Sequence, residues 1–140
     1  MMKKILLGCF IVGSAFLFTH CDVTYDNVVN IRSIAAENVY LNFLGRLITV
    51  TPNASVQIKD VRKGTYRFAT TFDIPSSVTG ASVEGESEGE IVMGPGTRVA
   101  IFYSSRIQAT TGTGGTAGQT NYILIASISS SDDVNTATGP

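Results

Sequence analysis

The sequence has little of the chemistry that most enzymes use. Its 140 residues contain one histidine, two cysteines and no tryptophan, so the histidine and cysteine clusters that hold zinc are absent. Charged residues make up only 15% of the chain and hydrophobic residues 44%, which excludes a disordered, highly charged tail. The formal net charge of −1 also argues against electrostatic binding of nucleic acid. The length suffices for one domain.

The first 20 residues carry the features of a bacterial signal peptide. Lys3 and Lys4 form a positive start, and residues 5–18 follow as an apolar stretch without a charge. This stretch has the length of a signal-peptide core and is shorter than the roughly 20 apolar residues of a spanning helix. We therefore expect export, with an uncleaved anchor or a buried helix as the alternative.

The residues that follow the apolar stretch, LFTHC at 17–21, resemble the lipobox of bacterial lipoproteins. In that family the cysteine thiol receives a diacylglyceryl group, and the cysteine becomes the new N-terminus. The resemblance implies lipidation of Cys21. Phe18 and His20 differ from the residues that the family prefers, so cleavage after Ala15 by the ordinary signal peptidase is the alternative.

The cysteine count favours lipidation. Cys9 lies inside the apolar stretch and is removed with it, which leaves Cys21 as the single thiol and allows no internal disulfide. A lone thiol in an exported protein needs an explanation, and lipidation provides one. Cleavage before Cys21 also removes His20, the only histidine. No Ser–His or Cys–His pair then exists for nucleophilic catalysis, so we expect that the protein is not an enzyme.

Residues 28–130 have the periodicity of strands except in two segments: 76–90 is small, polar and acidic, and 109–120 is Gly/Thr-rich and expected to be a loop between two strands. Residues 65–74 alternate aromatic or β-branched side chains with smaller and charged ones, which indicates a half-buried strand. The runs at 98–104 and 121–129 are almost continuously apolar and predict central strands, covered on both faces or packed against a neighbouring molecule. About eight short strands separated by turn residues predict an all-β, antiparallel β-sandwich. The expected strands are 28–34, 38–44, 47–51, 56–60, 65–74, 90–93, 98–104 and 121–129.

The order of these elements resembles a widespread family of bacterial cell-surface domains of unknown function. The resemblance rests on VRKGTYRF at 61–68, GEIVMGPGTRVAIFYSS at 89–105 and a last strand that ends at 132–133. The Gly-Thr-Tyr turn at 64–66 is also similar to that of PEGA-type surface domains. The first resemblance implies a single immunoglobulin-like β-sandwich, often found on lipoproteins, and neither family brings catalytic residues.

The segment 84–90 is the most unusual local feature. In an extended chain, Glu84, Glu86, Glu88 and Glu90 would all point to one side and repel one another. A calcium ion would relieve this repulsion, with the aspartates at 132–133 as further ligands if the last strand ends nearby. The segment is therefore interpreted as either a weak calcium site or a solvated acidic loop. A glycosidase-type carboxylate pair is a further alternative.

Together these observations predict a small, non-enzymatic lipoprotein of the cell envelope. We expect a signal peptide at 1–20, a lipidated N-terminus and tether at 21–27, a β-sandwich at 28–130 and a polar tail at 131–140. Its expected partner is a membrane, through the lipid on Cys21, facing the periplasm or the cell surface. The expected role is structural or adhesive, without a cofactor. The alternative is a self-associating subunit of a filament, sheath or appendage, because apolar strands can pair with a neighbouring chain.

Overall fold

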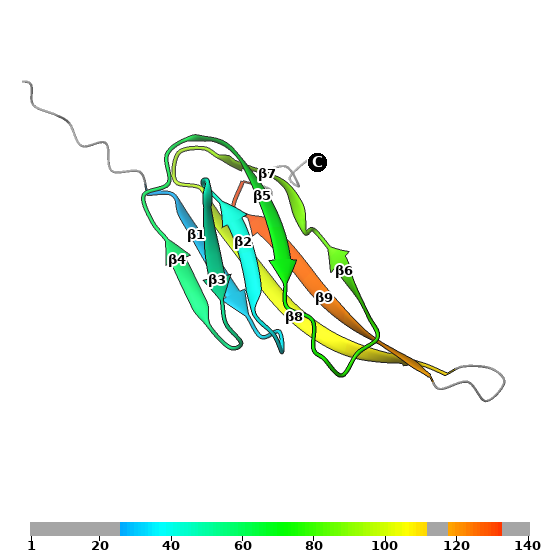
Figure 1. The fold of residues 1–140 in the computed structure, drawn as a ribbon. Coiled ribbons are helices and arrows are strands. Elements are labelled where there is room, and N and C mark those ends of the chain that lie inside the picture. The colour runs from blue at the N-terminus through cyan, green and yellow to red at the C-terminus, as the bar shows by residue number, and fades with distance from the viewer. Residues whose placement is uncertain (1–25, 112–117, 133–140) are drawn as a thin grey trace, which may run out of the picture.

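The computed structural model describes residues 26–111 and 118–132. These residues form nine strands in two sheets that face each other (Figure 1). They contain no helix that is long and apolar enough to cross a membrane. The strands are β1 (Val28–Ser33), β2 (Val39–Phe43), β3 (Arg46–Val50), β4 (Ser55–Ile58), β5 (Gly64–Phe72), β6 (Gly80–Gly85), β7 (Glu88–Met93), β8 (Arg98–Thr110) and β9 (Gln119–Ser130).

The two sheets confirm the prediction of an all-β, sandwich-like fold. They correct the prediction that all strand pairs are antiparallel. One sheet has the order β4-β1-β8-β9-β6 and the other the order β3-β2-β5-β7. All pairs of the four-stranded sheet are antiparallel, as expected. In the five-stranded sheet, β1 pairs with β8 and β6 pairs with β9 in parallel, so the purely antiparallel prediction is wrong. A parallel pair needs a crossover connection, and both crossovers here run through the other sheet.

The core lies between the sheets and follows the alternation of the sequence. Val39, Leu41 and Phe43 of β2 are fully buried, while Asn42 between them is exposed. Phe68 of β5 is buried on the same side, as the alternation at 65–74 predicts. Because side chains of a strand point alternately to opposite faces, this pattern turns every second residue of β2 and β5 toward the opposite sheet.

Two segments that the sequence assigned to loops are partly strand. The acidic segment 76–90 contains β6, an edge strand with a single large apolar residue, Val83, which packs against the core. The Gly/Thr-rich segment 109–120 continues β8 to Thr110 and begins β9 at Gln119. Both were missed because their strands are held by backbone pairing with β9 or β8 and bury few side chains, so hydrophobic alternation is weak there.

The prediction of two central strands is correct, but only one of their faces is covered by the second sheet. Phe102 of β8 lies on the outer face and is 37% exposed. On β9, Ile123 lies on the outer face and is nevertheless buried. Arg106 is opposite Ile123 and forms an ion pair with Glu84 on the other side of β9. The aliphatic parts of these two charged side chains therefore extend across β9 and account for the burial of Ile123.

The domain is elongated, with both described ends of the chain on one side. Figure 1 shows the chain entering β1 and leaving β9 at one end, whereas the β8–β9 ribbon projects beyond the sandwich at the opposite end. β8 has 13 residues, so it extends for about 40 Å at the rise of a β-strand. The ribbon is therefore the part of the domain farthest from the tether that the sequence predicts.

Two buried tyrosines of this core allow a matched test of hydrogen bonding. The Tyr103 hydroxyl lies 2.8 Å from the Thr70 hydroxyl oxygen, whereas the buried Tyr122 hydroxyl has no hydrogen-bond partner among the described residues. We expect Tyr103→Phe to lower the free energy of unfolding by about 1 kcal/mol, and Tyr122→Phe to leave it unchanged or raise it. Urea unfolding followed by circular dichroism compares the two. An equal loss in both variants would contradict this assignment.

Candidate functional site

The predicted lipidation site, Cys21, lies outside the described residues, which begin at Asp26. The structure does describe how the chain is held where the expected tether joins the domain. Asn27 is fully buried there; its side-chain amide donates to the Val61 carbonyl at 2.8 Å, and its side-chain oxygen accepts from the Thr97 amide at 2.8 Å. The Thr97 hydroxyl donates to Asp132 at 2.7 Å. Thr97 thus ties the first and last described residues of the domain together.

The acidic segment does not form one extended run. β6 ends at Gly85, whose φ of +90° turns the backbone, and β7 begins at Glu88 in the other sheet. The expectation that the four glutamates share one side is therefore wrong. Glu84 is ion-paired with Arg106, and Glu90 with Arg67 at 3.4 Å.

Glu86, Glu90 and Asp132 are among the residues that line a small hollow of about 250 Å³. The condition that the last strand ends near the acidic segment is therefore met at Asp132. Across residues 26–111 and 118–132, however, no three histidine, cysteine or acidic side chains are grouped closely enough to hold a metal ion. The described residues therefore give no support to the calcium site predicted at Glu84, Glu86, Glu88 and Glu90.

A polar cluster covers the outer face of the four-stranded sheet near the end of β5. Tyr40 of β2 is half-buried, and its hydroxyl donates to Asp73 at 2.9 Å. Asn38 donates to the same carboxylate oxygen at 3.1 Å. The hydrogen bond to Asp73, followed by burial and the negative charge of Asp73, raises the pKa of Tyr40. The cluster is satisfied internally and holds the β2 and β5 strand ends together.

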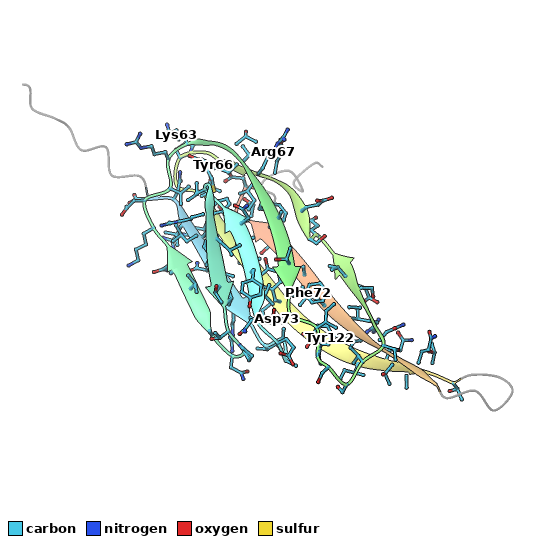
Figure 2. The ribbon with its side chains drawn as sticks, in the orientation of Figure 1. Lys63, Tyr66, Arg67, Phe72, Asp73 and Tyr122 are labelled. Carbon is cyan, nitrogen blue, oxygen red and sulfur yellow. The ribbon has the colours of Figure 1, made fainter. Side chains whose placement is uncertain are left out.

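A groove of about 910 Å³ lies at the other end of β5. It is bounded by the β2–β3 turn at Leu44 and Gly45, by the first half of β5 and by the start of β7. Figure 2 shows Tyr66 and Arg67 at this end, and Phe72 and Asp73 at the opposite end of β5. The Arg67–Glu90 pair that borders the groove is largely exposed. The groove offers surface for a bound chain but no buried polar or charged side chain that would select a particular ligand.

The β8–β9 ribbon leaves part of a sheet edge without a partner strand. β1 pairs with β8 only as far as Ser33, opposite Tyr103. From Ser104 to Thr110, β8 pairs with β9 on one side, and no described strand pairs with it on the other. Ile107, in the middle of this stretch, is 57% exposed. We call residues 104–110 the open edge of β8.

Sequence reasoning missed the open edge, although a signal for it exists. The run IQAT at 107–110 and the run QTN at 119–121 are polar but contain β-branched residues and no proline, which is compatible with strands. Tyr103 and Tyr122, by contrast, are fully buried in the core. Burial of the Tyr103 ring raises its pKa, and the hydrogen bond with Thr70 partly offsets this.

The described residues therefore present two features that fit a binding or structural role, the groove and the open edge of β8. Glu84 and Glu90 are exposed and each is paired with an arginine, so these two carboxylates do not form a preorganised pair. No protein-family model matches the chain, and the search of curated proteins finds no match either.

Proposed function

We propose that this chain is an exported bacterial lipoprotein with a non-enzymatic, structural or adhesive role at the cell envelope, held in a membrane by a lipid on Cys21. The N-terminal sequence supports this proposal through its charged start, its apolar stretch and the cysteine that follows. The several acyl chains of a processed lipoprotein provide stable anchoring, whereas one chain alone binds a membrane marginally.

The observation that carries the proposal is that the domain has two different ends, one at which the described chain enters and leaves and one formed by the β8–β9 ribbon. Thr97 links Asn27 to Asp132, near the two described ends of the domain. Figure 1 shows the chain entering β1 and leaving β9 at this end, and the β8–β9 ribbon projecting from the other end. A lipid on Cys21 would be separated from the domain by only a few residues. The ribbon would then point away from the membrane, as expected of a domain that presents a surface to a partner.

The proposal also includes an immunoglobulin-like relationship for the fold. Two sheets packed face to face around alternating apolar side chains support it. Any immunoglobulin-like relative must share the parallel pairing of β1 with β8 and of β6 with β9, or differ from this domain at those two pairs.

Intact mass tests the anchor directly. We expect protein extracted from native membranes with detergent to have the mass of residues 21–140 plus acyl chains. Cys21→Ala should abolish incorporation of a labelled fatty acid. Cys9→Ala is the matched control, because Cys9 lies in the leader and should leave labelling unchanged. An unlipidated chain that begins near Phe16 would overturn the proposal.

A further inference from the structure

We propose that the open edge of β8 pairs with the same edge of a second copy of this chain, in an antiparallel arrangement centred on Ile107. The pairing would give the proposed adhesive role a specific contact. The contact itself does not require a lipid on Cys21. Three observations support the pairing: residues 104–110 pair with β9 on one side only, Ile107 is exposed, and this register brings compatible residues face to face.

The backbone of the open edge has groups free to pair. The Tyr103 carbonyl accepts a hydrogen bond from the Ile34 amide, so it faces the side of β1, away from β9. Backbone groups alternate in direction along a strand, so those of Ser105, Ile107 and Ala109 face the same side. No described strand pairs with them there. The Ala36 amide donates to the Ser105 hydroxyl at 2.9 Å, so the segment after β1 still borders Ser105. Beyond it, Ile107 and Ala109 provide four open backbone groups for a new ladder.

The open edge also lacks the features by which proteins protect such edges. Its sequence SSRIQAT contains no proline and one charged residue, Arg106. Arg106 forms its ion pair with Glu84 on the outer face of the sheet rather than at the edge. Ile34, where pairing with β1 stops, adds a second exposed apolar side chain at 48%. An edge of this kind is suited to pairing with an extended chain.

The second copy is the occupant because the edge is complementary to itself. The other side of β8 is taken by β9, so two copies meet through the same edge, related by a twofold axis, and their β8 strands run antiparallel. Centring on Ile107 places Ile107 opposite its copy and covers both side chains. The same register sets Arg106 opposite Gln108 and Ser105 opposite Ala109, so no like charges face each other.

This pairing determines how two anchored domains are oriented. β8 runs from the end that holds Asn27 and Asp132 toward the ribbon (Figure 1). In an antiparallel pair, the two tethered ends therefore point in opposite directions. Two copies in one membrane cannot both stand upright in this dimer, whereas copies in two facing membranes can. The open edge would thus link opposed surfaces, a consequence that does rest on the proposed anchor.

Disulfide trapping tests the register in the full chain. Across an antiparallel pair, the Cα atoms of Ile107 and its copy would lie about 5.5 Å apart, within the range that a disulfide spans. We expect Ile107→Cys to give a covalent dimer when the detergent-solubilised full chain is mildly oxidised. Thr110→Cys is the matched control, because its two copies would be roughly 20 Å apart along the strands. The parent chain measures any background from Cys21. Equal crosslinking of both variants, or none with Ile107→Cys, would overturn the register.

A proline variant tests whether the backbone of the edge makes the contact. Ile107→Pro removes an N–H that faces the open side and leaves the β9 ladder intact, whereas Ile107→Val keeps the donor and an apolar side chain. In sedimentation of the detergent-solubilised chain, we expect dimers for the parent and the valine variant and monomers for the proline variant. Circular dichroism confirms that the proline variant is folded. A parent that remains monomeric at high concentration would overturn the pairing.

Vesicle clustering separates the pairing from the anchor. We expect phosphatidylethanolamine–phosphatidylglycerol vesicles that carry the parent chain to cluster, and those that carry Ile107→Pro to stay dispersed. Protein that dimerises but does not float with the vesicles would contradict the lipid anchor, while the crosslink still supports the pairing. Protein that floats and dimerises without clustering vesicles would overturn the linking of opposed surfaces.

Discussion

Replacement of Asn27 by alanine is expected to lower the free energy of unfolding by about 3 kcal/mol or more, because it leaves two buried backbone groups without partners. Asn27 donates to the Val61 carbonyl and accepts from the Thr97 amide, both at 2.8 Å, and all three residues are buried. Each orphaned group costs roughly 1–3 kcal/mol in desolvation, and water has no direct access to replace the lost bonds.

Asn30→Ala is the matched control for this variant. Asn30 is a nearby asparagine, three residues further along in β1. Its side chain is exposed and accepts a single hydrogen bond from Gln57. Its loss should change stability by less than about 0.5 kcal/mol, as for most surface substitutions. Urea unfolding of both variants, followed by circular dichroism, measures the difference. Similar losses in the two variants would show that the Asn27 hydrogen bonds are replaced by water.

Gly85→Ala is expected to destabilise the domain by about 3 kcal/mol, and to detach the β6 end of the sheet. Gly85 has a φ of +90°, and a Cβ at this position would collide with the Ala126 carbonyl oxygen. That oxygen accepts a hydrogen bond from the Glu86 amide at 3.1 Å, which holds the turn between β6 and β7 against β9. The collision is with backbone, so no side-chain rotation can relieve it.

Gly96→Ala separates this collision from backbone strain. Gly96 has a φ of +73°, but a Cβ there would meet no atom within 4 Å. Only the cost of a left-handed conformation remains, about 1–2 kcal/mol. In thermal unfolding, the midpoint temperature of Gly85→Ala should therefore be well below that of Gly96→Ala. If the two midpoints coincide, steric contact with Ala126 contributes nothing measurable, and the role assigned to this turn is wrong.

Sequence reasoning succeeded where side chains are buried on one side of a strand. The alternation in β2 and β5 identified the buried positions Val39, Leu41, Phe43 and Phe68, since a residue's face follows from the period of two. It failed for β6 and for the far half of β8, because those segments are held by backbone pairing with β9 rather than by a buried face. Their amino acids are small or polar, and their strand character depends on the neighbour that supplies the ladder.

The candidate sites divide in the same way. The lone thiol at Cys21 and its lipidation remain a prediction from sequence, because Cys21 lies outside the described residues. The acidic segment 84–90 is conspicuous in the sequence, but the turn at Gly85 places Glu84 and Glu90 in separate sheets, each beside an arginine. The open edge of β8 has no sequence motif, because an edge is defined by the strand that is missing beside it.

By itself, the sequence determined that the domain is built of short strands and which large apolar side chains of β2 and β5 face the core. Those properties depend on local periodicity, which a single segment contains. Only the tertiary structure decided that β1 and β8 are parallel and that Arg106 forms an ion pair with Glu84 across β9. It also decided that β8 extends beyond the end of β1, which leaves Ile107 exposed. These features depend on which strands become neighbours and in what register, and that choice is made by packing the two sheets as a whole.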